Sequence, residues 1–219
     1  MKTLLIQKDI NNTSIEHFLD IARQKKTELI CFGELSTSGC MYTAREVPAF
    51  ESILKILDNY DMRVMLGLPR VTESGTYNSY LYYYQGESQI YNKINLFPPM
   101  NEPTVYRAGT IPGVFKTDFG RIGVAICYDI RFPTLFDDLR KEHVDRIFVP
   151  AAFPRVRIDD WKRILAERAT QTGVPVIGIN AVGNDGENEF GGSTSVIDAD
   201  GKVIRQAGET EEEIIEVEL

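Results

Sequence analysis

The stretch GVAICYDIRFP, Gly123–Pro133, predicts both the fold class of this chain and the place of its chemistry. The apolar residues from Ile122 to Ile126 have the pattern of a buried strand, which ends abruptly at Cys127. A cysteine at the C-terminal end of a buried strand lies at the edge of a sheet, where α/β folds place reactive groups. On its own this signal stays open, because a free cysteine is more often a small core residue than a nucleophile.

Two other segments have the same construction. In ELICFGELSTSGC, residues 28–40, an apolar strand leads to Glu34, and in IYNKINLFPP, residues 90–99, a tyrosine-rich strand leads to Lys93. Taken alone, Glu34 could cap a turn and Lys93 could be a solvated surface charge. Together with Cys127 they form a chemically complete set: the acid takes the thiol proton, the thiolate attacks, and the ammonium holds a developing oxyanion.

Three of these motifs resemble the nitrilase superfamily of carbon–nitrogen hydrolases. FGEL at 32–35, YNKINLF at 91–97 and GVAICYDIRFP at 123–133 resemble its glutamate, lysine and cysteine motifs. The resemblance continues through 161–169, 176–183 and 191–201, so it covers nearly the whole chain. Three motifs in the right order are far more specific than one short pattern. CYDIRFP looks most like the ω-amidase branch, whose members hydrolyse the terminal amide of 2-oxo dicarboxylic acid monoamides.

The resemblance implies a mechanism with no metal and no cofactor. Glu34 would be the general base for Cys127, and Lys93 with the backbone N–H of Tyr128 would hold the oxyanion of a small carboxamide substrate. A thioester would form as ammonia leaves, and Glu34 would then activate water. Glu102, nine positions after Lys93, matches an additional glutamate that orients the lysine, although it also fits a loop charge.

One position departs from the family pattern. Members usually carry histidine two residues after the lysine, where this chain has Asn95. Asparagine forms hydrogen bonds but does not titrate near neutral pH, which puts any proton-handling role of that position in doubt.

Substrate recognition calls for a cation, because an ω-amidase must bind a carboxylate at the far end of its substrate. Arg131, four residues after Cys127, is the leading candidate, and a structural ion pair with a nearby aspartate is the alternative. Tyr42, Phe153 and Trp161 are the aromatic residues expected to wall the pocket, although the helical spacing of Trp161 fits a core position as well.

Composition agrees with such an enzyme. A chain of 219 residues fits one domain, residues 1–219, with a sizeable core. The net charge of −8 argues against a nucleic-acid surface and against binding to anionic membranes. Two histidines, neither near a cysteine in sequence, make a zinc site improbable.

The cysteines and the N-terminus bear on location. Cys31, Cys40 and Cys127 cannot all pair within one chain and form no CxxC motif, which favours a reducing compartment. The first ten residues lack the pattern of a signal peptide, and no apolar run is long enough to cross a bilayer. The cytoplasm is therefore expected, with Cys31 and Cys40 as structural residues.

Strand-like and helix-like segments alternate along the chain. This order predicts two sheets with helices on their outer faces, and the resemblance implies a four-layer α-β-β-α sandwich that assembles as a homodimer or larger homo-oligomer. A helix directly after Cys127 would favour its thiolate. Strands are predicted at 4–7, 28–32, 63–67, 77–85, 89–92, 113–117, 121–127, 146–150, 175–181, 193–198 and 203–207, helices at 14–25, 49–60, 132–141 and 159–172, and an acidic loop at 209–213.

Other functions fit the same sequence. An N-carbamoyl amide hydrolase or a deaminated-glutathione amidase would use the same three residues with different pocket residues. From another class, the chain could be a catalytically silent binding subunit. Trapping of the thiol by an amide-like electrophile would separate an enzyme from a silent subunit.

Overall fold

Two large sheets form the centre of the molecule. The structure, a computed structural model, describes residues 1–39 and 47–219. The first sheet contains β1 (Lys2–Gln7), β2 (Leu29–Phe32), β3 (Arg63–Thr72), β4 (Gly75–Tyr84), β5 (Glu87–Asn92) and β14 (Glu213–Glu218), in the order β14-β1-β2-β3-β4-β5. The second contains β6 (Gly113–Thr117), β7 (Gly120–Val124), β8 (Arg146–Pro150), β9 (Val176–Ile179), β12 (Ser195–Ile197) and β13 (Val203–Gln206), in the order β13-β12-β9-β8-β7-β6.

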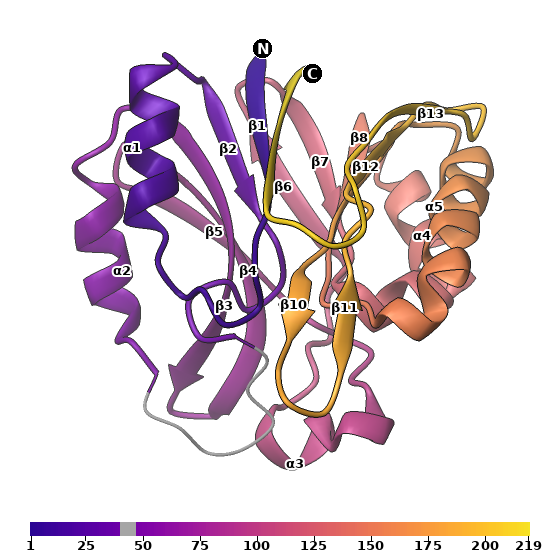
Figure 1. Cartoon of the computed structure of the whole chain (residues 1–219), viewed down its shortest axis with the longest axis horizontal. Coiled ribbons are helices and arrows are strands. Elements are labelled where there is room, and N and C mark those ends of the chain that lie inside the picture. Colours follow the sequence, from indigo (N-terminus) through magenta and orange to yellow (C-terminus); the bar gives the residue numbers. More distant parts are fainter. Residues whose placement is uncertain (40–46) are drawn as a thin grey trace.

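Helices cover the outer face of each sheet. On one side lie α1 (Glu16–Gln24) and α2 (Phe50–Leu57), and on the other α4 (Pro133–Lys141) and α5 (Ile158–Thr172), as Figure 1 shows. The short α3 (Glu102–Val105) and the hairpin of β10 (Val182–Asn184) and β11 (Glu189–Gly191) lie at one end of the sandwich, and the two chain ends lie together at the other. The predicted α-β-β-α sandwich is confirmed.

The burial of β2 explains why its sequence is an uninterrupted apolar run. Leu29 and Cys31 face the core between the two sheets, whereas Ile30 and Phe32 face the core beneath α1 and α2. All four side chains are fully buried, as expected for a strand with layers on both faces. The prediction that Cys31 lies within a buried strand is confirmed, while Cys40 lies outside the described residues.

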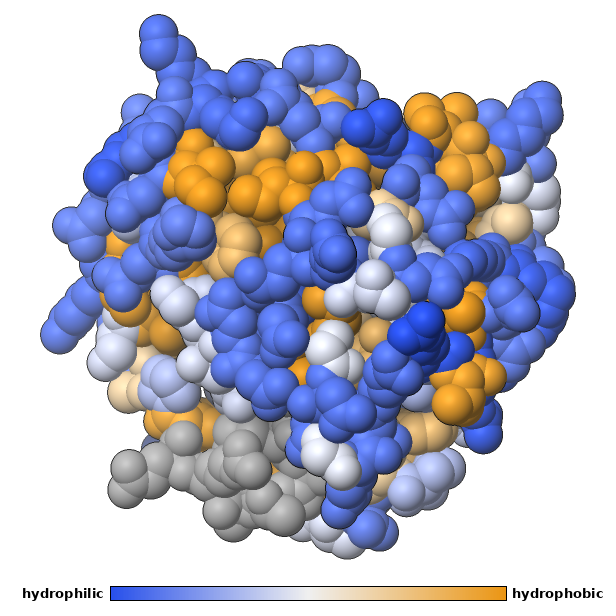
Figure 2. Space-filling model, viewed as in Figure 1, coloured by the Kyte–Doolittle hydropathy of each residue, from blue (hydrophilic) through white to orange (hydrophobic). Residues whose placement is uncertain are grey.

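The same logic shapes the helices. In α1, Phe18, Leu19 and Ala22 recur at the spacing of one helix face and are buried against the first sheet. In α5, Trp161 and Leu165 lie one turn apart and pack on the second sheet. Among the described residues no helix is long and apolar enough to cross a membrane. The face drawn in Figure 2 is mostly hydrophilic, with hydrophobic residues gathered in a band in its upper part.

Most predicted elements are present, with two informative differences. β14 is not among the predicted strands, and its sequence EIIEVE interrupts its isoleucines and valine with glutamates; the strand pairs antiparallel with β1 along its whole length. The strand predicted through Cys127 ends at Val124, and a 3₁₀ turn covers Cys127–Arg131 before α4 begins at Pro133. The segment after the nucleophile candidate is therefore a tight turn, not the start of a long helix.

Parallel pairing brings the chemistry-bearing strand ends together. β1, β2 and β3 run parallel in the first sheet, and β7, β8 and β9 run parallel in the second. The C-terminal end of β2 leads to Glu34, and the end of β8 leads to Ala152. The Ala152 N–H donates to Glu34 Oε2 at 3.0 Å. This hydrogen bond connects the segment after β2 in the first sheet with the segment after β8 in the second.

Candidate active site

Glu34 and Lys93 meet at the core of the site. Glu34 follows β2, Lys93 follows β5, and Lys93 Nζ donates to Glu34 Oε1 at 2.8 Å. The side chains are 0% and 1% exposed. A buried charge requires a partner of opposite charge, and here Glu34 and Lys93 are partners for each other. Gly67 of β3 permits this placement, because a Cβ at that position would lie 2.3 Å from Gly33 O and 2.8 Å from Glu34 Cα.

Glu102 holds Lys93 from the other side. It begins α3, is fully buried, and accepts from Lys93 Nζ at 3.0 Å on Oε1 and 2.9 Å on Oε2. Its Oε2 also accepts from the backbone N–H of Phe97 at 2.6 Å. Asn78, on β4, completes the cluster: its Nδ2 donates to Glu34 Oε1 at 2.7 Å and to Glu102 Oε1 at 2.8 Å.

Cys127 lies at the edge of this cluster on a strained backbone. Its φ of +46° is in the left-handed region that residues with a side chain seldom adopt. This conformation occurs at the first residue of the 3₁₀ turn that follows β7. Its Sγ donates to Ala152 O at 3.9 Å, so one peptide segment contacts both Cys127 and Glu34.

Asp129 fixes the turn that carries Cys127. It is fully buried, and its Oδ2 accepts from Ile126 N–H at 2.9 Å and from Tyr91 OH at 2.8 Å. Its Oδ1 accepts from both the N–H and the Nδ2 of Asn95, at 2.8 and 2.9 Å. Asn95 thus ties the segment after Lys93 to the turn that carries Cys127.

Electrostatics favour a protonated thiol at rest. Desolvation raises the pKa of Cys127, and the negative charge of Glu34 raises it further, against the opposing effect of Lys93. Burial acts to lower the pKa of Lys93, but the carboxylates of Glu34 and Glu102 outweigh it and hold that pKa well above its ordinary value. Burial also raises the pKa of Glu102, against the opposing effect of Lys93.

A pocket opens over these groups. Its lining includes Lys93, Cys127 and the side chains of Tyr128 and Phe153, with Phe97, Met100, Arg131, Ala152, Pro154 and Arg157. The Tyr128 ring contacts the rings of Phe97 and Phe132, with centroids 4.9 and 5.2 Å away. Most of the lining residues are thus apolar or aromatic, and the others are the Lys93 ammonium, the Cys127 thiol and two arginines.

Two predicted pocket residues need comment. Trp161 occupies the core position that its helical spacing also fits: it is fully buried against Phe153, with ring centroids 5.3 Å apart, and its Nε1 donates to Ser193 O at 3.2 Å. It supports the wall instead of forming it. Tyr42 lies outside the described residues. Arg131 lines the pocket, stacks over Phe153 and contacts Asp160 at 3.2 Å.

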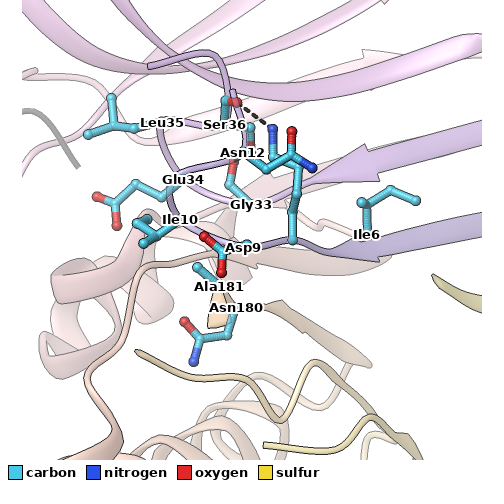
Figure 3. A pocket seen from close by; sticks show the side chains of 11 residues that line it. Ile6, Asp9, Ile10, Asn12, Gly33, Glu34, Leu35, Ser36, Asn180 and Ala181 are labelled. Carbon is cyan, nitrogen blue, oxygen red and sulfur yellow. Dashed lines mark hydrogen bonds between the residues drawn. The ribbon is translucent and has the colours of Figure 1, made fainter. Parts of the chain in front are cut away.

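Glu34 itself lines a second pocket. Figure 3 shows its lining, in which the Glu34 carboxylate is turned away from Ile6. Lys8 also lines it, and its buried Nζ donates to the carbonyl oxygens of Ser36 and Ser14 at 2.6 and 3.2 Å. Asn180 anchors the neighbouring segment, because its Oδ1 accepts from Phe153 N–H at 2.7 Å. Among residues 1–39 and 47–219, no cluster of histidine, cysteine, aspartate or glutamate is arranged to hold a metal ion.

Sequence reasoning missed Asn78, Ala152 and the anchoring role of Asp129. Ala152 acts through its backbone, which leaves no trace in residue type. Asn78 has a usable signal: it is in phase with Tyr80 and Tyr82, whose rings face the core between the sheets. A polar residue on the inward face of a buried strand requires a partner.

Comparison with known proteins agrees with this geometry. Residues 6–219 match the carbon-nitrogen hydrolase family. A Schizosaccharomyces pombe protein described as a probable nitrilase is 30% identical over 203 residues, 86% of this chain and 74% of the relative. The 2-oxoglutaramate amidase of Bacillus subtilis is 28% identical over 219 residues, 95% of this chain and 84% of the relative.

A solved structure extends the agreement to the fold. The crystal structure of a CN-hydrolase superfamily protein from Xanthomonas campestris superposes with a TM-score of 0.85 at 24% identity, covering 99% of this chain and 89% of that one. At this identity the likeness concerns the fold. Taken with the family match across almost the full sequence, it leaves one conclusion: this chain belongs to the carbon-nitrogen hydrolase family.

Proposed function

We propose that this chain is a cysteine-dependent amidase that hydrolyses a small carboxamide to its acid and ammonia, with ω-amidase activity on 2-oxoglutaramate or 2-oxosuccinamate. The observation that carries the proposal is that Lys93 and Cys127 line one pocket, while buried Glu34 binds Lys93 at 2.8 Å and shares the contact residue Ala152 with Cys127. Family membership supports hydrolysis of a carbon–nitrogen bond, and the Bacillus subtilis relative supports this substrate class.

The first half-reaction forms a thioester. Cys127 Sγ attacks the carboxamide carbon while its proton passes to Glu34, and the carbonyl electron pair moves onto oxygen. Lys93 and the Tyr128 N–H stabilise the oxyanion, where one lost donor costs about 3–4 kcal/mol in the transition state. When the two Glu102 oxygens share one Lys93 hydrogen, one N–H of Lys93 is available for this contact. Collapse breaks the C–N bond, and Glu34 returns the proton to the departing ammonia.

The second half-reaction regenerates the thiol. Glu34 takes a proton from water, hydroxide adds to the thioester carbon, and the C–S bond breaks as the proton returns to sulfur. Residues of this chain supply every group in the cycle. The protonated resting thiol fits this scheme, because it requires a base beside the sulfur at the moment of attack.

Arg131 is the proposed anchor for the distant carboxylate. It reaches Asp160 through Nη2 alone, and a guanidinium carries five N–H donors, so donors remain for a bidentate contact with substrate. The carboxylate would then exchange with or add to Asp160. The nearby Arg157 would strengthen the positive potential of the same wall.

Ammonia release from 2-oxoglutaramate and 2-oxosuccinamate tests the proposal, with Cys127→Ala as the inactive control. We expect release that is lost in Cys127→Ala, and a KM raised at least tenfold with little change in kcat for Arg131→Gln. Preference for an N-carbamoyl amino acid or deaminated glutathione would refute the substrate assignment. If no amide releases ammonia and an amide-like electrophile does not modify Cys127, the proposal that this chain is an enzyme is refuted. The predicted homodimer and cytoplasmic location are separate proposals, tested by light scattering of the purified protein and by cell fractionation.

A further inference from the structure

The acceptor sites of the two buried glutamates are almost fully occupied. A carboxylate has two lone-pair sites on each oxygen. In Glu102, Oε1 accepts from Asn78 and Lys93, while Oε2 accepts from Lys93 and the Phe97 N–H. All four sites of Glu102 therefore face donors, and a proton can enter only by displacing one of them.

Glu34 differs by one site. Its Oε1 accepts from Lys93 at 2.8 Å and from Asn78 at 2.7 Å, which fills both lone pairs. Its Oε2 accepts one bond, from Ala152 N–H at 3.0 Å. The remaining lone pair of Oε2 lies beside the peptide segment whose carbonyl, Ala152 O, accepts from Cys127 Sγ. Of the eight sites on the two carboxylates, this is the one that no donor among the described residues fills, and its oxygen contacts the residue, Ala152, that also contacts the thiol.

Asn78 creates this asymmetry. Its amide has two hydrogens, and each points to Oε1 of a different glutamate. The orientation is fixed by chemistry, because an amide oxygen in the same place would face two carboxylate oxygens. Asn78 is 1% exposed, and its Oδ1 accepts no hydrogen bond from the described residues, so its donor half is the half that the cluster uses.

We propose that Asn78 is a positioning residue that reserves Oε2 of Glu34 as the atom that accepts the thiol proton of Cys127. The inference rests on the proposed amidase function and deepens it. Without the amide, Oε1 of Glu34 has an open lone pair next to Glu102, and a proton held between the two glutamates is out of reach of sulfur. The cluster would then hold a proton at a pH at which the wild-type site is ready to react.

The test compares Asn78→Ser and Asn78→Asp with a neighbouring control. Aspartate keeps the shape of asparagine but replaces a double donor with a third acid, whereas serine removes the amide. Ser79→Ala on the same strand is the control, because Ser79 is equally buried and its Oγ bonds to Asn92 Oδ1 at 2.7 Å, away from the carboxylates. Circular dichroism and thermal melts establish which variants are folded.

Two readouts are measured against pH: kcat/KM for 2-oxoglutaramate, and the rate of iodoacetamide alkylation at Cys127, followed by peptide mass spectrometry. The titratable groups that face the cluster are Lys93, Cys127 and Asp129, and all are unchanged in these variants. We expect the acidic limb of both profiles to move up by about one pH unit in Asn78→Ser, since a hydrogen bond to a charged group is worth about that shift. Asn78→Asp should move at least as far, and Ser79→Ala should not move.

The outcomes separate the two proposals. If Asn78 only fills space, Asn78→Ser retains the wild-type limb, and the inference is wrong. A limb that moves equally in Ser79→Ala also refutes it, because the effect would then be general loosening. If wild type releases no ammonia but the alkylation limb moves as expected, the substrate assignment fails and the role of Asn78 stands. Should Asn78→Ser not fold, an acidic limb that does not move in Asn78→Asp refutes the inference, because that variant loses both amide donors.

Discussion

Replacing Glu102 with glutamine separates the structural role of this acid from the catalytic role proposed for its partner Lys93. Glutamine has nearly the same shape, but one carboxylate oxygen becomes an NH₂ group. In either orientation that NH₂ faces two donors: Asn78 and Lys93 at the Oε1 position, or Lys93 and the Phe97 N–H at the Oε2 position. The change therefore breaks at least two hydrogen bonds and leaves Lys93 with Glu34 as its remaining carboxylate.

The size of the effect follows from these contacts. Hydrogen bonds to charged groups are worth about 1.5–3 kcal/mol each, so two lost bonds amount to about 3–6 kcal/mol. Relief of the buried negative charge of Glu102, whose pKa is raised first of all by burial, offsets part of this loss. We expect Glu102→Gln to lower the free energy of unfolding by about 3 kcal/mol, near the range for a broken buried ion pair. Displacement of Lys93 should lower kcat/KM by at least about 100-fold.

Urea unfolding at neutral pH measures the first quantity, and ammonia release measures the second. Glu142→Gln is the control, because Glu142 forms an exposed ion pair with Arg121 at 2.7 Å and should change stability by less than about 1 kcal/mol. A Glu102→Gln variant as stable as this control would refute the donor arrangement described here. If Glu102→Gln unfolds at the wild-type urea concentration but releases no ammonia, Glu102 contributes to activity and not to stability.

Three further changes test other parts of the structure. Burial lowers the pKa of Lys8 to about 8 from 10.5, so between these values the unfolded chain retains a proton that the folded chain has released. Stability should therefore rise between pH 8 and 10 by about 2 kcal/mol more in wild type than in Lys8→Met, as measured by urea unfolding at each pH. Gly67→Ala places a Cβ 2.3 Å from Gly33 O, and should cost about 1–3 kcal/mol and more than tenfold in activity; a variant with wild-type kcat/KM would contradict this contact. Tyr91→Phe removes the 2.8 Å bond to buried Asp129 and should lower unfolding free energy by about 1–3 kcal/mol, whereas an unchanged urea midpoint would show that the bond is dispensable.

The sequence predicts where several strands end because a strand that is buried on both faces is a continuous apolar run. β8, Arg146–Pro150, has the bounds predicted from its apolar run, and the apolar strand that leads to Glu34 is present as β2. The site is harder to predict where function lies in the backbone or in register. The Ala152 N–H contacts Glu34 across 118 positions of sequence, and no residue type marks such a contact.

Asn78 shows the limit more sharply. In the run YNSYLYYY it reads as one polar residue in a strand, and its two partners lie 44 and 24 positions away. Only the pairing of β4 with β3, which places Asn78 opposite Pro69, aligns it with the end of β2. Strand register depends on contacts between distant segments, so local propensity does not determine it. The shortening of β7 has a similar cause, because Asp129 takes the Ile126 N–H into a turn.

The site exists only where the two sheets meet. Glu34 and Lys93 come from the ends of strands in the first sheet, whereas Cys127 and Ala152 follow strands of the second. The contact of Ala152 with Glu34 and the left-handed backbone at Cys127 both depend on this packing, since a strained residue of that kind costs about 1–3 kcal/mol and persists only when its surroundings impose it. Separation of the sheets would release the strain and also move Glu34, the proposed base, away from the thiol. The core between the sheets, which contains Tyr80, therefore maintains the reactive geometry as well as the fold.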